Sequence, residues 1–382
     1  MTRRILLVHS GSSFSTHDVY VGLLGGFKLE GVEVIPWRLD YHMTGAQEWV
    51  KFCLEREGHE DVEVSPGDVL YQMAKGLAIR VIETLPDAVV IVSGLRIDQR
   101  GYQLLERLGV PVILFGTENP YDDDYYFGRA PFCDVMTCND AVSVDPIAEH
   151  SRRVGSRCRV LFMPLGYLPP IHYPGVGAQL PDVPSHDVVF VGTGFPERVR
   201  FLEAIDWAGI DLGLYGSWEH HNPDEPERPA LALDSPLRPF LRDNVVSNGV
   251  TAALYDKAKI TLNLFRTAAW RESGIVDRTN GTAISPRLIE AAAIGACVAS
   301  EWRPEVEPFG GNTIATFTSP AECEAVIRRL LADEGERAIM RAAIIDRAEG
   351  YSYQVRARQL LGLVDEIAAT SRQGIDRRAE VA

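Results

Sequence analysis

The sequence predicts an α/β protein of two domains, each with an open parallel sheet covered by helices on both faces. The chain has 382 residues, which suffices for two domains at about 150 residues each. Short apolar runs alternate with segments of helical period in two separate blocks, the pattern of parallel sheets covered by helices. A proline-rich stretch, residues 166–184, separates the two blocks. Together these observations predict two Rossmann-like domains.

The first block, residues 1–165, is the predicted N-terminal domain. Its short apolar runs are typical of buried parallel strands, at 5–8, 32–35, 88–92, 110–115, 134–137 and 160–163. Segments of helical period between these runs include residues 67–85 and 98–108.

The second block, residues 185–350, is the predicted C-terminal domain. It has predicted strands at 188–191, 212–215, 260–265, 296–299 and 313–317, and predicted helices at 197–207, 286–294 and 321–331. Two such sheets that face each other direct the carboxyl ends of their strands toward one central cleft. This geometry suits an enzyme with two substrates.

The remaining segments join the domains and complete the chain. Six prolines in residues 164–184 prevent a helix or a central strand, so we expect a linker at 166–184. A last helix near 353–369, within a terminal segment 351–382, is expected to cross back to the N-terminal domain. The polar tail from residue 371 is expected to fray.

Composition and charge narrow the classes of function. Hydrophobic residues make up 46% of the chain, as in soluble globular proteins, and the net charge of −15 disfavours binding to nucleic acid or anionic membranes. No apolar run approaches the roughly 20 residues that span a bilayer, and no signal segment is evident. We therefore expect a cytoplasmic protein without a membrane span. The six cysteines form no Cys-x-x-Cys pair and no zinc-ligand pattern, so no metal site is expected.

The most informative motif begins a helix in the second block. Ser285 is a good helix cap and Pro286 suits the first helical position, so exposed amides there could bind an anion. Arg287 follows directly. Glu290 interrupts the apolar helix, and a buried carboxylate needs partners. These partners could be ligand hydroxyls, a backbone amide or solvent.

A second motif joins a strand to a helix through the turn Gly192-Thr193-Gly194. Glycine lets the backbone approach a phosphate, and Arg198 in the first helical turn offers a planar fork of donors to a diphosphate. The dinucleotide fingerprint is incomplete because Glu197 stands where a third glycine belongs. An ordinary strand-to-helix turn is the alternative interpretation.

A third motif is the strand at 260–265, whose carboxyl end delivers Asn263 and Arg266 toward the same crevice. Arg266 is a second candidate for contact with phosphate charge. Its alternative role is that of a solvated arginine at the end of a strand.

In this order, these segments resemble the CgeB-like (spore-maturation protein) glycosyltransferases, a branch of the GT-B superfamily. The resemblance covers most of the chain and rests on Phe190-Val191-Gly192-Thr193, Glu197-Arg198, Leu214-Tyr215-Gly216, Ile260-Thr261-Leu262-Asn263, Arg266, Ser285-Pro286-Arg287-Leu288-Ile289-Glu290-Ala291, Glu118-Asn119-Pro120-Tyr121-Asp122 and Thr137-Cys138-Asn139-Asp140. It implies a GT-B fold and a metal-independent, retaining transferase. The donor, a nucleoside-diphosphate sugar, would bind the C-terminal domain and the acceptor the N-terminal domain.

The resemblance also implies roles for individual residues. Related retaining enzymes use a Glu-x7-Glu pair, of which Glu290 matches the second member, which grips the ribose; Thr282 occupies the first position. Positive groups near the departing diphosphate lower the barrier, and we assign this catalytic role to Arg198 and Arg266. The expected donor-binding residues are Gly192, Thr193, Gly194, Arg198, Tyr215, Gly216, Asn263, Arg266, Thr282, Ser285, Arg287 and Glu290.

The acceptor side is expected on the N-terminal domain. Glu118 is the candidate catalytic carboxylate there, and Tyr121 and Asp122 follow it, although the run Asp122-Asp123-Asp124 is also typical of a solvated loop. The loop after the first strand would contribute contacts from Gly11, Ser12 and His17. The side chain of His17 could serve as a polar contact or as a base, and the alternative interpretation is a loop histidine with neither role.

Three other functions remain open. A sugar-nucleotide epimerase or hydrolase of GT-B fold would keep the donor site, and a non-catalytic two-lobed binder of nucleotide sugars or small molecules would lack turnover. A DNA-modifying glycosyltransferase fits the fold but not the charge of −15. We expect no cofactor and no metal; a protein, a glycan or a small molecule would each fit as acceptor.

Overall fold

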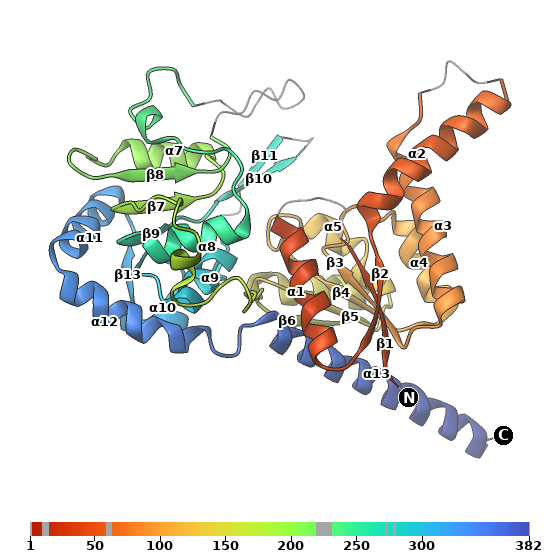
Figure 1. The fold of residues 1–382 in the computed structure, drawn as a ribbon. Coiled ribbons are helices and arrows are strands. Elements are labelled where there is room, and N and C mark those ends of the chain that lie inside the picture. The colour runs from red at the N-terminus through yellow and green to blue at the C-terminus, as the bar shows by residue number, and fades with distance from the viewer. Residues whose placement is uncertain are drawn as a thin grey trace. The chain divides into compact units, whose positions relative to one another are not determined.

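A computed structural model describes residues 2–9, 15–58, 63–218, 231–271, 274–277 and 280–381 of the chain. The chain divides into two compact units, Met1–Leu165 together with Tyr353–Ala382, and Gly166–Ser352 (Figure 1). Each unit contains one parallel sheet with helices, which confirms the predicted α/β class and the two Rossmann-like folds.

The sheet of the N-terminal unit has six parallel strands in the order β2-β1-β3-β4-β5-β6. Its strands are β1 (Arg4–Val8), β2 (Glu33–Trp37), β3 (Ala88–Val92), β4 (Val112–Phe115), β5 (Val135–Cys138) and β6 (Arg159–Phe162). In β3 every residue is buried, as its unbroken run of apolar residues requires when helices cover both faces. In the register, Ile5 of β1 lies opposite Val34 of β2 and Ala88 of β3.

The helices of this unit are α1 (Ser15–Leu29), α2 (Leu39–Arg56), α3 (Pro66–Thr84), α4 (Gln99–Leu108), α5 (Asp123–Phe127), α6 (Val144–Arg153) and α13 (Tyr353–Val381). Short 3-10 turns occur at η1 (Ala130–Phe132) and η2 (Ala141–Ser143). Local sequence signals set their ends. The Ser65 hydroxyl caps α3 by accepting from the amide of Asp68, and Gly109 ends α4 in the left-handed conformation.

The C-terminal helix α13 packs against α1 within the N-terminal unit. Glycine makes this close approach possible, because a Cβ on Gly26 would lie 2.6 Å from the carbonyl oxygen of Tyr353. The Arg356 guanidinium donates to the carbonyl of Pro164 at 2.7 Å, which joins α13 to the end of the first block. The helix continues to Val381, through the segment that the sequence analysis expected to fray.

The sheet of the C-terminal unit has five parallel strands in the order β13-β12-β9-β7-β8. Its strands are β7 (Val188–Val191), β8 (Leu212–Tyr215), β9 (Ile260–Asn263), β12 (Val298–Glu301) and β13 (Ile314–Phe317). A separate antiparallel pair, β10 (Ala268–Arg271) and β11 (Gly274–Asp277), was not predicted.

The helices of this unit are α7 (Pro196–Glu203), α8 (Asn248–Lys257), α9 (Pro286–Ile294), α10 (Val306–Gly310), α11 (Pro320–Ala332) and α12 (Glu334–Ile344). The 3-10 turns are η3 (Val176–Gln179), η4 (Arg238–Phe240), η5 (Gly311–Thr313) and η6 (Ile345–Ala348). The proline-rich segment lies in this unit as well. Lys257 holds it by donating to the carbonyls of Leu180 and Val183 at 2.6 and 2.7 Å.

The strand orders identify where each unit can hold a ligand. In open parallel sheets the ligand crevice lies beyond the carboxyl ends of the strands, at the point where the winding direction reverses. This point is between β1 and β3 in the N-terminal unit and between β7 and β9 in the C-terminal unit. In the described part of the chain, every helix is too short or too polar to cross a membrane.

Candidate functional site

Asn263, the last residue of β9, is the centre of a hydrogen-bond cluster in the C-terminal unit. Its amide nitrogen donates to the hydroxyl of Ser300 at 2.9 Å. Its amide oxygen accepts from the hydroxyl of Ser285 at 2.8 Å and from the guanidinium of Arg287 at 3.3 Å. Three predicted donor-binding residues are thereby brought together at the carboxyl end of the sheet.

Arg287 links the start of α9 to the end of β7. Its Nε donates to the carbonyl of Val191 at 2.8 Å, and its guanidinium lies 4.9 Å from the ring centroid of Phe190. A Cβ on Gly192 would come within 2.7 Å of this guanidinium. The first glycine of the predicted turn therefore makes room for an arginine that belongs to the same site.

The other two predicted glycines are also required by close contacts. A Cβ on Gly194 would lie 2.4 Å from the ring of Trp218, which is almost fully buried. Gly216 has a φ of +101°, and a Cβ there would lie 2.5 Å from the carbonyl oxygen of Gly192. The backbone turns after β7 and β8 thus pack directly on each other.

Arg198 is 7% exposed, and its guanidinium donates to two backbone carbonyls. The acceptors are the carbonyl of Thr193 at 3.0 Å and that of Leu264 at 2.9 Å. These residues follow β7 and β9, the two strands between which the winding reverses. Arg198 therefore fixes the two loops that border the crevice.

The remaining predicted donor residues have contacts outside this cluster. Arg266 is half-buried after β9, and its carbonyl accepts from Arg303 at 2.8 Å. The hydroxyl of Thr282 donates to the carboxylate of Glu305 at 3.2 Å. Glu290 is half-buried on α9. Burial is the main cause that raises the pKa of neighbouring Tyr255, and the charge of Glu290 adds to it.

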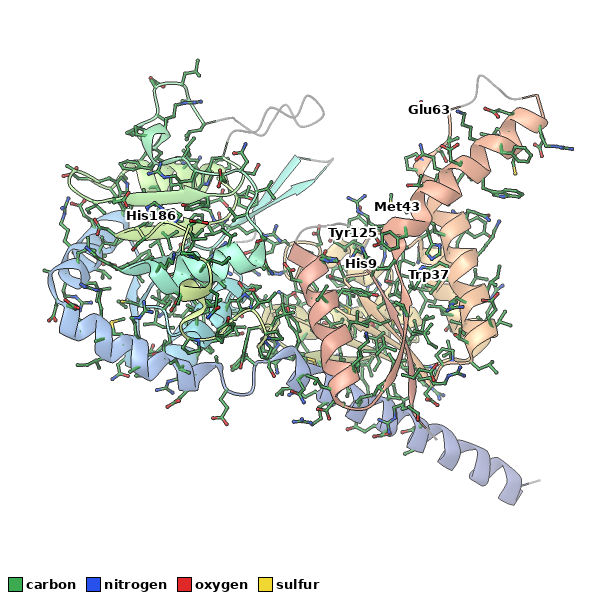
Figure 2. The ribbon with its side chains drawn as sticks, viewed as in Figure 1. His9, Trp37, Met43, Glu63, Tyr125 and His186 are labelled. Atoms are coloured by element: carbon green, nitrogen blue, oxygen red, sulfur yellow. The ribbon has the colours of Figure 1, made fainter. Side chains whose placement is uncertain are left out.

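The ring of Tyr215 points to the opposite edge of the sheet. Its hydroxyl hydrogen-bonds with Nε2 of His186 at 2.9 Å, and Nδ1 of His186 lies 2.9 Å from the carboxylate of Asp211. His186 lies two residues before β7 and Asp211 lies directly before β8, so the Tyr215 hydroxyl lies toward the amino ends of these strands (His186 in Figure 2). This leaves the backbone of Tyr215 at the crevice.

In the N-terminal unit, the predicted acceptor loop is held by a polar network after β4 and β5. The amide of Glu118 donates to the hydroxyl of Tyr126 at 3.3 Å, and that of Asn119 donates to the side chain of Asn139 at 2.9 Å. The side-chain amide of Asn119 donates to Asp123 at 2.7 Å. Asp123 is therefore part of this network. The sequence analysis had given a solvated loop as the alternative interpretation of the run Asp122-Asp123-Asp124.

Within this loop, Glu118 and Asp122 are half-buried and Tyr121 is 7% exposed. On the other predicted acceptor segment, Gly11 and Ser12 lie outside the described residues. His17 is described: its Nδ1 lies 2.9 Å from Nε2 of His9, a residue that the sequence analysis did not single out. His9 directly follows β1, and this place at the carboxyl end of a parallel strand was the only feature of the sequence that could have marked it as a candidate.

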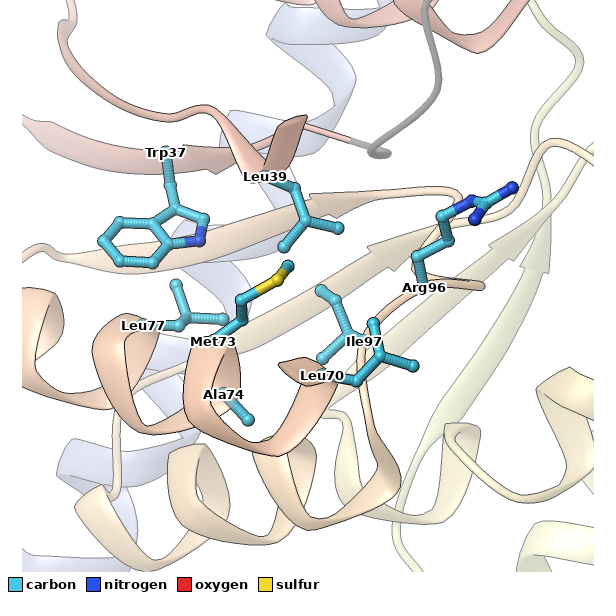
Figure 3. A pocket seen from close by; sticks show the side chains of 8 residues that line it. All are labelled: Trp37, Leu39, Leu70, Met73, Ala74, Leu77, Arg96 and Ile97. Carbon is cyan, nitrogen blue, oxygen red and sulfur yellow. The ribbon is translucent and has the colours of Figure 1, made fainter. Parts of the chain in front are cut away.

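A small apolar pocket lies beside β2 and α3 of the same unit (Figure 3). Its lining consists of Trp37, Leu39, Leu70, Met73, Ala74, Leu77, Arg96 and Ile97. No predicted site residue in the described part of the chain is among them. This pocket is therefore separate from the sites considered above. Among the described residues, no group of three or more His, Cys, Asp or Glu side chains is arranged to hold a metal ion.

Comparison with known proteins adds a family to this geometry. Residues 198–362 match the model of a family described as glycosyl transferase-like. The matched segment contains Arg198, Asn263, Ser285 and Glu290. No curated protein matches the chain.

Solved structures match nearly the whole chain. Sucrose-phosphate synthase from Thermosynechococcus elongatus is 13% identical with a TM-score of 0.62, covering 96% of this chain and 100% of its own. Anabaena HepE, solved in complex with UDP-glucose, is 12% identical with a TM-score of 0.58. The match covers 96% of this chain and 99% of HepE. A UDP-N-acetylglucosamine 2-epimerase homologue from Listeria monocytogenes is 10% identical with a TM-score of 0.55. The match covers 97% of this chain and 98% of the Listeria protein. The GT-B fold and, with the family match, the glycosyltransferase class are confirmed.

Proposed function

We propose that the protein transfers a sugar from a nucleoside-diphosphate sugar to an acceptor and that its C-terminal unit binds the donor. The observation that carries this proposal is the Ser285, Asn263 and Arg287 cluster, which holds the start of α9 at the carboxyl end of β9. A helix N-terminus at a winding reversal presents backbone amides and partial positive charge to an anion. The diphosphate of the donor is the anion that this arrangement suits.

The chemistry follows from the leaving group. As the bond between the sugar and the diphosphate breaks, negative charge grows on the phosphate, and fixed positive groups stabilise it. Arg287 supplies a cationic side chain in the cluster, Arg266 three residues after β9 would supply a second, and Arg198 keeps the loops after β7 and β9 in place. Thr193 and the glycines beside it form the turn that would approach the phosphates.

The nucleoside and the sugar would be held by carboxylates of this unit. Glu290 on α9 is the expected partner of the ribose hydroxyls. Thr282 replaces the first carboxylate of the Glu-x7-Glu pair, yet its hydroxyl donates to Glu305. Glu305 therefore supplies a carboxylate beside the position where the related enzymes carry one.

The solved structures support a nucleotide-sugar donor, because HepE was solved with UDP-glucose. We place the acceptor on the N-terminal unit, with Glu118, Tyr121, Asp122 and His17 as its contacts. Membership of the CgeB-like branch, retention of configuration, independence from metal and a cytoplasmic location stay predictions. So does the absence of nucleic acid among the partners.

The likeness to the Listeria epimerase homologue favours one second candidate, a sugar-nucleotide epimerase or hydrolase. Both functions use the same donor site. They differ in the product, since a transferase passes the sugar to an acceptor hydroxyl and an epimerase leaves an isomeric nucleotide sugar or a free sugar.

The test is to incubate the full chain with UDP-glucose, UDP-N-acetylglucosamine, GDP-mannose, ADP-glucose and dTDP-glucose, with and without glycan, peptide and small-alcohol acceptors. Chromatography measures the nucleoside diphosphate released, and ¹H NMR identifies the sugar product. We expect release from one nucleotide family, accelerated by an acceptor that becomes glycosylated. Conversion without an acceptor to an isomeric or free sugar would support the second candidate. No conversion of any donor by folded protein would contradict both.

A further inference from the structure

Helix α2 of the N-terminal unit has two apolar faces. The first packs on the core of the unit and consists of Leu39, Met43 and Ala46. The second consists of Tyr41, Trp49 and Phe52, which fall within about 80° of the helix circumference at 3.6 residues per turn. These three side chains are 71%, 54% and 48% exposed. A helix that is apolar on two faces is suited to a partner on each, so this second face, the aromatic stripe, is a candidate binding surface.

Contacts within the unit order the rings of the aromatic stripe. The centroids of Trp49 and Phe52 lie 5.8 Å apart with the rings tilted against each other. The Arg38 guanidinium lies 4.2 Å from the ring centroid of Tyr41, and that of Arg56 lies 5.9 Å from the ring centroid of Phe52. The stripe is therefore a set of rings held by their neighbours on the same helix and at its start.

The aromatic stripe leads away from the ligand-binding edge of the sheet. Helix α2 starts at Leu39, two residues after the end of β2, and so begins at the carboxyl edge (Figure 1). From Tyr41 to Phe52 the stripe extends about 16 Å along the helix. A Cβ on Gly45 would meet no atom within 4 Å, so the backbone between the first two rings is open as well. This length suits an extended partner rather than a single small molecule.

The charge around the aromatic stripe disfavours two kinds of partner. Six Asp or Glu residues and two Lys or Arg residues stand between residues 48 and 63. An anionic membrane would be repelled by this excess of carboxylates. In a two-fold pair of antiparallel α2 helices, the flank that carries Glu48 would face its own copy, and two like charges would meet. A second copy of the chain is disfavoured for that reason.

A neutral sugar chain fits both the rings and the carboxylates. The faces of many sugar rings consist of C–H groups, whose slightly positive hydrogens pack on the negative face of an aromatic ring. The hydroxyls at the edge of the sugar can donate to a carboxylate, and Glu48, next to Trp49, is exposed. A cationic peptide fits less well, because Tyr41 and Phe52 already have a guanidinium of this chain beside them.

We propose that the aromatic stripe of α2 binds a neutral glycan of several sugar residues and that this glycan is the acceptor. This inference rests on the proposed function and names the class of acceptor. The sugar near Tyr41 would lie toward the carboxyl edge of the sheet, the edge that β4 and the predicted acceptor residue Glu118 also reach. The sugars farther out would stack on Trp49 and Phe52.

The first test measures binding without a donor. The full chain, carrying a fluorescent label, is applied to an array of immobilised neutral and charged glycans, and a soluble form of the bound glycan is then titrated. We expect binding to one type of neutral oligosaccharide and weaker binding to its monosaccharide. Trp49→Leu should lower the affinity about 10-fold, whereas Trp49→Phe, which keeps an aromatic face, should retain most of it.

Ile82→Ala is the matched control, because Ile82 on α3 is an apolar side chain of the same unit with a similar exposed fraction, 57%. It should bind the glycan as the wild type does. The second test measures turnover with the nucleotide sugar that the screen above identifies. Trp49→Leu should raise KM for the oligosaccharide acceptor about 10-fold and leave the donor KM unchanged.

Several outcomes would overturn the inference and leave the proposed function intact. One is a wild-type protein that turns over the donor but binds no glycan of the array, and another is equal glycan binding by a folded Trp49→Leu variant. A wild-type dimer in sedimentation that Trp49→Leu dissociates would show that a second copy covers the stripe. Binding to polylysine, or to vesicles of phosphatidylcholine and phosphatidylglycerol, that Trp49→Leu abolishes would show a different partner.

Failure of the proposed function gives a separate result. Folded wild-type protein that turns over no donor would refute that function, and with it the role of the glycan as acceptor. Glycan binding and its dependence on Trp49 are measured without a donor, so the two failures are distinguishable.

Discussion

The hydroxyl of Ser285 donates to the side-chain oxygen of Asn263 at 2.8 Å and accepts from the amide of Leu288 at 3.2 Å. One hydroxyl thus caps α9 and ties the helix start to the last residue of β9. The cap bond contributes to the stability of α9, and the bond to Asn263 contributes to the candidate donor site. They can be separated by mutation because other helices of the chain, α3 and α11, also begin with a capping Ser followed by Pro.

Ser285→Ala should lower stability by about 1 kcal/mol, the usual cost of losing a cap, and should also weaken donor binding. Ser319→Ala is the matched control. Ser319 caps α11 by accepting from the amide of Glu322, and Pro320 follows it as Pro286 follows Ser285. Urea unfolding and titration with the donor nucleotide measure the two effects. Equal donor affinity in both variants would contradict the role given to Ser285.

Gly194→Ala should disturb the turn after β7, because its Cβ would lie 2.4 Å from the rigid, buried ring of Trp218. We expect a loss of stability of about 1–3 kcal/mol and a rise in donor KM. Gly249→Ala in α8 is the control, since its Cβ meets no atom closer than 4.0 Å and alanine favours a helix. If Gly194→Ala changed neither the stability nor the donor KM, the turn would have to adapt to the added Cβ, which would contradict this prediction.

Arg198→Ala should cost stability as well as activity, because it leaves the buried carbonyl of Leu264 and the half-buried carbonyl of Thr193 without this donor. Each unsatisfied buried group costs about 1–3 kcal/mol. Arg200→Ala, an exposed arginine on the same helix, should change neither stability nor turnover. If Arg198→Ala kept wild-type stability and lost only donor affinity, its main role would be direct contact with phosphate.

Stability should fall as the pH is lowered from about 6.5 toward 4. Burial lowers the pKa of His172 from 6.5 to about 4, so below 6.5 the unfolded chain binds a proton that the folded chain does not. The stabilising contribution is therefore complete above pH 6.5 and is lost on acidification. His9 acts in the same direction.

Chemical unfolding at pH 7.5 and 5.5 measures this dependence. The amide of Leu168 donates to Nδ1 of His172 at 3.1 Å, so His172→Gln should be less stable at pH 7.5. The variant should lose less on acidification than the wild type does. An identical pH dependence in the two proteins would rule out His172 as a source of it.

The sequence predicted the sheets well because buried parallel strands are short apolar runs bounded by turn residues. The runs at 88–92, 188–191 and 212–215 coincide with β3, β7 and β8. Helix α2 was missed because it has almost no buried stripe: Leu39 and Ala46 are buried, whereas Tyr41, Trp49 and Phe52 are exposed. Strand β10, Ala268–Arg271, has no apolar alternation in its sequence and was missed for that reason.

The places of the candidate site residues in the fold were predictable from the sequence, and their contacts were less so. Cap and glycine signals identified Ser285 and Gly192 as crevice residues. The bond from Asn263 to Ser300, in contrast, depends on the pairing of β9 with β12, which lie far apart in sequence. The direction of the Tyr215 ring and the burial of Arg198 depend on such packing too. His9 gave no local signal beyond its place after β1.

The most direct test of the donor site is the melting temperature of the full chain with UDP, GDP, ADP, CDP and dTDP, in wild type and in Glu290→Ala. A ligand that binds only the folded state raises the melting temperature. We predict that one nucleoside diphosphate stabilises the wild type and that Glu290→Ala, with an unchanged melting temperature of its own, loses most of this shift. A folded wild-type protein that responds to none of the five would contradict the proposed donor site.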